Sequence, residues 1–135
     1  MADANKVDIF VDALHEEGYR AKPYERDGTF HVESATSGYT ILFSFASEGT
    51  IQMFCGIKRA EDSEISFESI NDFNRKYRFA KMYLDDDRDL NSQADFFFDP
   101  SASTVKDNIR QILSLMDVTV SEMKVILANS SVNQA

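Results

Sequence analysis

The apolar residues in the first half of the chain change from a helical spacing to an alternating one. Val7, Phe10 and Leu14 recur at the spacing of one helix face, and Gly18 follows where such a helix would end. Beyond it, apolar and polar residues alternate in four segments, separated by the turn-like clusters RDGT, ATSG and SEGT. We therefore predict a first helix followed by an antiparallel meander of three or four strands.

The helical spacing returns twice in the second half. Ile70, Phe73 and Tyr77 predict a short helix between residues 66 and 77, and a longer apolar stripe predicts a closing helix between residues 104 and 127. Between these helices, alternating segments on either side of an Asp-rich turn predict a second hairpin.

Three features bear on the closing helix. Thr104 and Asp107 have the spacing of a capping box at its start. The β-branched run DVTV at 117–120 could bend or break it. The tail NSSVNQA is polar and is expected to fray.

These elements give the order α-β-β-β(-β)-α-β-β-α over residues 1–135, without a repeat or linker to divide them. Strands joined by hairpin-length connections and interrupted by helices are typical of α+β proteins. We expect one domain, in which helices pack on an antiparallel sheet of about five or six strands.

Charge and composition narrow the possible partners and location. The chain has 135 residues and a formal net charge of -9, so its surface should repel nucleic acid. No apolar run approaches the length of a membrane span, and the acidic start MADANKVDIF does not resemble a signal peptide. Cys55 is the only cysteine and cannot form an internal disulfide. We expect a cytoplasmic protein with no membrane or nucleic-acid partner.

Residues that could support catalysis are few. Cys55 falls on the predicted core side of its strand, while His15 and His31 lie on outward faces of separate elements. One cysteine and two distant histidines also lack the spacing of a zinc site. We predict no catalytic residue, no bound metal and no cofactor.

The aspartates of the second hairpin match the spacing of a calcium-binding loop only in part. Asp85, Asp87 and Asp89 match the first three ligand positions of an EF-hand, but Leu90 stands where its glycine belongs and Phe96 where its closing glutamate belongs. Aspartate also favours turns through its own side-chain hydrogen bonds. We interpret the group as a turn.

The sheet carries apolar residues on its second face as well. Leu42, Phe54 and Phe97 alternate away from the main apolar stripes, and Met82 is expected to join them. If the helices cover only the first face, this second face predicts a homodimer or the capture of a protein or peptide segment. The other interpretation is that a helix of the same chain covers it.

Asn74 lies beside the buried stripe of the second helix, where its amide needs hydrogen-bond partners. One interpretation is a structural bond that anchors this helix to the following hairpin. The other is a ligand contact shared with Arg78, which would make the protein a small-ligand sensor or an enzyme with a pocket between the second helix and that hairpin.

A family resemblance covers this same region. The stretch INDFNRKYRFAKMYLD, its Asp-rich turn, the strand ADFFF and the long closing helix resemble the YbjN family, described as putative bacterial sensory transduction regulators. The resemblance implies a fold similar to type III secretion chaperones, often dimeric, without known catalytic residues. Phe73 stands where the family often has tryptophan and Arg88 where it often has glycine. The matching positions, expected to be structural, are Asn71, Phe73, Asn74, Arg78, Phe79 and Ala80.

The residues and the resemblance together favour a non-enzymatic protein-binding module. The small-ligand sensor or enzyme remains the alternative.

Overall fold

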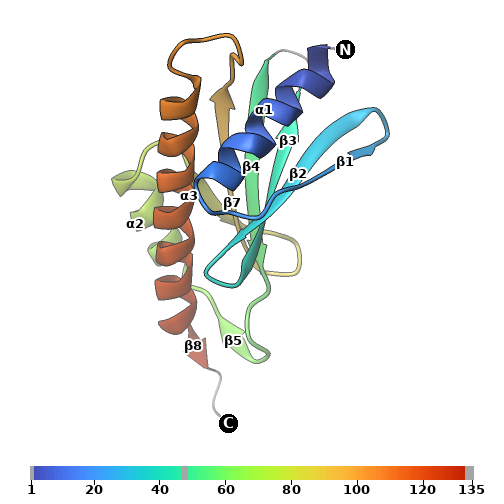
Figure 1. The fold of residues 1–135 in the computed structure, drawn as a ribbon. Helices are drawn as coiled ribbons and strands as arrows, with labels where there is room; N and C mark the ends of the chain where they lie inside the picture. The colour runs from blue at the N-terminus through green and yellow to red at the C-terminus, as the bar shows by residue number, and fades with distance from the viewer. Residues whose placement is uncertain (1, 47–48, 133–135) are drawn as a thin grey trace.

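The chain folds around a six-stranded antiparallel sheet with the strand order β1-β2-β3-β4-β7-β6 (Figure 1). The structure is a computed structural model that describes residues 2–46 and 49–132. The strands of the sheet are β1 (Lys22–Arg26), β2 (Thr29–Thr36), β3 (Tyr39–Phe45), β4 (Thr50–Ile57), β6 (Lys81–Leu84) and β7 (Leu90–Phe97). Together with three helices, this confirms the predicted α+β class and the order of its main elements.

Two helices cover one face of the sheet and bury its apolar stripe. These are α1 (Ala2–Glu16) and α3 (Val105–Ala128), which lie across the sheet in Figure 1. Phe10 of α1 is fully buried, and its ring meets those of Phe43, Phe45 and Phe98 at centroid distances of 4.8, 5.4 and 5.8 Å. Edge-to-face packing of this kind adds to the burial energy of the rings.

A hydrogen-bond network ties the end of α1 to β2 and α3. Gly18 adopts a positive φ of 87°, and the N–H of Tyr19 reaches back to the carbonyl of Leu14, which closes the helix as predicted. The Tyr19 hydroxyl then donates to the Asp117 carboxylate at 2.6 Å, and the Thr36 hydroxyl donates to its other oxygen at 2.8 Å. One carboxylate on α3 therefore holds both the connection between α1 and β1 and the end of β2.

The closing helix α3 is continuous through residues 117–120, so the break considered there does not occur. Thr119 and Val120 are buried, and this packing offsets their lower helix propensity. The capping-box prediction is wrong, since Thr104 has a φ of -97° and a ψ of 12° and caps no N–H with its side chain. Its hydroxyl accepts a bond from the Asn108 amide instead, and Asp107 pairs with Arg110.

Two other boundaries differ from the prediction. Ser131 and Val132, within the tail expected to fray, form β8 (Ser131–Val132), which pairs with the two-residue strand β5 (Ser63–Glu64). Residues 133–135 of that tail lie outside the described residues. The second hairpin also does not follow directly on the predicted helix at 66–77, because β6 begins at Lys81 and residues 78–80 form no strand.

Candidate protein-binding groove

The second face of the sheet is open but less apolar than predicted. Leu42 and Phe54 are cross-strand neighbours there, and both are half-buried. A Cβ placed on Gly56 would lie only 3.3 Å from the Phe54 ring, so the ring lies against its own strand. The row that contains this pair crosses all six strands and is otherwise polar or charged, with Lys22, Glu33, Gln93 and Lys81.

Met82 does not belong to this open face, which corrects the sequence-based prediction. It pairs with Ser92, and Ser92 pairs with Cys55 of the core stripe, so Met82 points to the helix-covered side and is buried. The error comes from the imperfect alternation of the segment around it. The partner-binding role of Leu42, Phe54 and Phe97 stays a prediction.

One edge of the sheet is incomplete. The pairing between β6 and β7 stops at Lys81 and Gln93, but β7 continues to Phe97. Beyond this point the N–H of Phe98 donates to the carbonyl of Gly49, toward β4. Backbone groups alternate in direction along an antiparallel strand, so those of Asp95 and Phe97 point the other way, where β6 no longer runs.

An apolar groove with a volume of about 670 Å³ lies between this free edge and α3. Phe97 is 89% exposed, Phe79 is 70% exposed and Val118 is 43% exposed. Most large apolar side chains of a folded chain are buried, so an exposed cluster of them is informative. The groove is lined by Phe79, Asp95, Phe96, Phe97, Asn108, Gln111, Ile112, Ser114, Leu115 and Val118.

Phe79 closes the end of the groove that is nearest to β6. Its φ is 72°, a conformation uncommon for a residue other than glycine, and its ring stacks on Phe96 with a centroid distance of 6.5 Å. Its neighbour Ala80 is fully buried, while Arg78 is exposed. The turn at Phe79 therefore directs the chain away from the position beside β7 that a longer β6 would occupy. The edge of β7 beyond Gln93 is left free.

The other family-motif positions belong to α2 (Phe67–Lys76) and join it to the sheet. Phe73 is buried and stacks on Tyr77 at 4.7 Å, whereas Asn71 is exposed. The Asn74 amide donates to the Met82 carbonyl at 3.0 Å and accepts from the Met82 N–H at 2.9 Å. Both amide atoms thus hold the outer edge of β6, and neither Asn74 nor Arg78 lines the groove.

The aspartates of the second hairpin come together but are engaged in the turn. One ligand oxygen from each of Asp85, Asp87 and Asp89 lies within 4.8 Å of the others. The Asp85 carboxylate, however, accepts bonds from the Asn91 amide and from the N–H groups of Asp87 and Asp89. These bonds, with that from Asn91 foremost, hold the pKa of Asp85 below its usual value. Asp85 therefore shapes this turn through its own side chain, as predicted for an aspartate-rich turn.

The residues considered for catalysis lie on three separate elements, α1, β2 and β4. Cys55 is buried, and this burial raises the pKa of its thiol to about 11, so the nucleophilic thiolate is scarce at neutral pH. His15 is exposed on α1. The Nδ1 of His31 lies 2.8 Å from the Ser44 hydroxyl on the open face, and its ring stacks on Tyr24.

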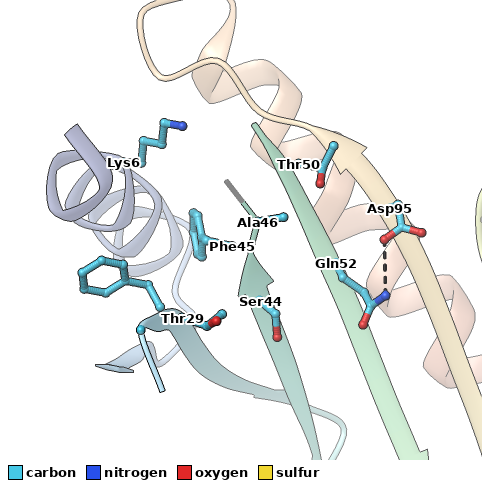
Figure 2. A pocket seen from close by; sticks show the side chains of 10 residues that line it. Lys6, Thr29, Ser44, Phe45, Ala46, Thr50, Gln52 and Asp95 are labelled. Atoms are coloured by element: carbon cyan, nitrogen blue, oxygen red, sulfur yellow. Dashed lines mark hydrogen bonds between the residues drawn. The ribbon is translucent and has the colours of Figure 1, made fainter. Parts of the chain in front are cut away.

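A second hollow of about 530 Å³ lies at the other side of Asp95, toward α1 and the β1–β2 turn. Figure 2 shows Lys6 reaching from α1 on one side, with Gln52 and Asp95 on their strands on the other. The Gln52 amide donates to the Asp95 carboxylate over 3.4 Å, a long bond. Among the described residues, its lining mixes polar side chains with apolar ones, including Phe30, Phe45 and Ala46, so it favours neither catalysis nor a particular ligand.

The α3 side of the groove was missed by the sequence analysis. Leu115 and Val118 stand three residues apart, beside the main buried stripe of α3, so they extend its apolar surface sideways. The β7 side was predicted in part, since alternation in the run of three phenylalanines at 96–98 turns Phe97 away from the main apolar stripe.

Among the helices in the described ranges, none has the length and apolar content to cross a membrane. The fold is similar to that of the type III secretion chaperone SycH of Yersinia pestis, whose crystal structure was solved in complex with a stable fragment of YscM2. The TM-score is 0.54 at 14% sequence identity, and the match covers 84% of this chain and 98% of that chain.

No curated protein matches the sequence. A family profile does match it, over residues 6–123, and this is the profile of YbjN, described as a putative bacterial sensory transduction regulator. That match spans most of the chain, from within α1 into the last turns of α3. The chain belongs to the YbjN family.

Proposed function

We propose that this protein is a non-enzymatic binding module that holds an apolar segment of a partner protein in the groove between β7 and α3. The observation that carries the proposal is the exposure of Phe97 and Phe79, which both line that groove. Burying such rings against a partner would remove a large apolar area from water, which is the main source of binding energy at protein interfaces.

The comparisons support a binding role in general terms. The chaperone SycH, which shares the fold, was solved with a protein fragment bound. The YbjN description adds a role in sensory transduction, and we propose that segment capture in the cytoplasm is how this chain would serve such regulation. A second copy of the chain is the other possible occupant, and the experiment below includes it.

A random library of twelve-residue peptides, selected against the folded protein, tests the proposal. Selected peptides should bind Phe97→Asp and Val118→Asp at least about tenfold more weakly than the wild type, because each change puts a charge in an apolar contact. Affinities are measured by fluorescence anisotropy, and circular dichroism verifies that each variant is folded.

The chain offers a matched control for each variant. Phe67 is 63% exposed on α2 and Val125 is 51% exposed on α3, and both lie outside the groove. Phe67→Asp and Val125→Asp should leave peptide affinity unchanged. Equal loss in the controls, or no loss in the groove variants, would contradict the proposal.

Sedimentation of the free protein tests whether a second copy of the chain occupies the groove. A dimer that dissociates in Phe97→Asp but persists in Phe67→Asp would assign the groove to self-association and overturn the capture of a foreign segment. A wild type that stays monomeric at micromolar concentration supports it.

A further inference from the structure

We infer that the partner segment binds as an added antiparallel β-strand on the free edge of β7, with a large apolar residue opposite Phe96 and a basic residue opposite Asp95. This inference rests on the proposed function, because it specifies the occupant of the same groove. It follows from the backbone of β7, the two sides of that strand and the charge at its edge.

The backbone requires an extended partner. Asp95 and Phe97 each direct one N–H and one carbonyl away from β4, toward the position beside β7 where β6 no longer pairs. A helix cannot pair with these four groups, since its own backbone bonds are internal. An extended segment can, and an antiparallel one would continue the arrangement of every neighbouring pair in the sheet.

The side chains then follow from the alternation along strands. Phe96 is on the helix-covered side, since it pairs with the buried Ile51. A partner residue opposite Phe96 would therefore point toward Ile112 and Leu115 of α3, which line the groove. A large apolar side chain suits this position.

Asp95 and Phe97 point to the open face, where the next partner residues would lie. Asp95 is exposed, and its only described side-chain bond is the long one from Gln52. A lysine or arginine opposite it would form a favourable cross-strand pair, which the net charge of -9 reinforces. Read from its N-terminus, the partner motif is an apolar residue opposite Phe97, a large apolar residue opposite Phe96 and a basic residue opposite Asp95.

Backbone methylation of a peptide recovered from the library tests the strand geometry. The N–H groups of the residues opposite Asp95 and Phe97 would face β7, while that of the residue between them would face solvent. N-methylation of either outer residue should weaken binding at least about tenfold, and N-methylation of the central one less than about threefold. If N-methylation weakened binding equally at the outer and the central residues, the strand inference would be overturned.

Amide hydrogen exchange by NMR gives the same test from the protein side. Binding of the peptide should slow exchange at the N–H groups of Asp95 and Phe97 at least about tenfold, because both become hydrogen-bonded. Ala94 and Phe96 already face β4 and should change little. Unchanged exchange at Asp95 and Phe97 would also overturn the inference.

A charge exchange tests the basic position. Asp95→Lys should weaken a peptide carrying the basic residue about tenfold, and a glutamate at that peptide position should restore binding. Glu25→Lys, which makes the same charge change on the exposed strand β1, is the control and should have little effect. Equal effects of the two variants would contradict the assigned register.

The outcomes separate the two proposals. If peptides lose affinity in Phe97→Asp but show no alternation on methylation, capture in the groove stands and the strand geometry fails. If no selected peptide depends on Phe97, the proposed function fails first.

Discussion

The two edges of the sheet differ in how they meet solvent. At one edge, β1 has the sequence KPYER, in which every residue but Tyr24 is exposed. Tyr24 is covered within the chain, because its ring stacks on His31 and the Arg26 guanidinium lies 5.9 Å above it. At the other edge, β7 ends beside exposed rings and carries outward backbone groups.

Free strand edges invite pairing with other chains, and proteins protect them with proline and charge. The β1 edge has both kinds of protection in Pro23 and its charged neighbours. The end of β7 has neither, apart from Asp95. The β1 edge is therefore protected against strand pairing along its length, whereas the last residues of β7 are not.

The largest expected effect comes from removing the clamp on β6. In Asn74→Ala, the buried Met82 loses partners for both its N–H and its carbonyl, so we expect about 2 kcal/mol of destabilisation. Urea denaturation measures it. Release of β6 would also lengthen the free edge, so the variant should self-associate at concentrations where the wild type does not. Asn71→Ala, an exposed change on the same helix, should do neither.

Removing the Tyr19 hydroxyl should weaken the attachment of the β1 side to α3. Tyr19→Phe deletes the 2.6 Å bond to Asp117 and should cost about 1 kcal/mol in urea denaturation at neutral pH. If Tyr19→Phe lowered the unfolding free energy at neutral pH as much as Asn74→Ala does, the two edges would be held equally strongly.

The same residue predicts a pH dependence. Burial, followed by the bond to Asp117, raises the pKa of Tyr19 to about 12 from 10.0. The unfolded chain therefore loses this proton first, so the stabilisation is complete below pH 10 and declines from pH 10 to 12. The difference in unfolding free energy between wild type and Tyr19→Phe should shrink over that interval. A constant difference would contradict the role of the hydroxyl.

Removing the protection of β1 tests the comparison directly. The double variant Pro23→Val/Glu25→Val should gain concentration-dependent association through β1, visible by sedimentation, with a change in stability below about 0.5 kcal/mol. Its association should persist when Phe97→Asp is added, because that residue belongs to the other edge. If it persists only with an intact Phe97, the two edges do not act separately.

The smallest effect is expected at the turn that joins β6 to β7. Arg88 has a φ of 67°, the left-handed region that glycine adopts readily, and its guanidinium lies 4.8 Å from the Phe67 ring. Arg88→Gly relieves the strain but removes the ring contact, so the unfolding free energy should change by less than about 0.5 kcal/mol. Arg88→Val, with a β-branched side chain, should be clearly more destabilising in the same assay.

Sequence periodicity was sufficient for the main elements and most of the core. Val7, Phe10 and Leu14 are buried as their spacing predicted, and so are Ile41 and Phe43 in the alternating segment of β3. These positions obey the period of their own element.

Sequence periodicity could not predict the features that depend on two segments distant in the chain. Met82 was assigned to the wrong face because the non-extended residues before Lys81 shift the alternation. The groove joins Phe97 to Val118 across an element boundary, and no local period relates them. The pairing of β8 with β5 likewise follows from where α3 ends in space.

The left-handed turn at Phe79 has one more consequence. Most exposed aromatic side chains sample several positions and lose that freedom when a complex forms, which weakens binding. The backbone of Phe79 is fixed in an uncommon conformation, with buried Ala80 next to it and Phe96 beneath its ring. A partner segment that binds here would contact a Phe79 backbone that folding has already ordered, so association would cost less conformational entropy at this residue.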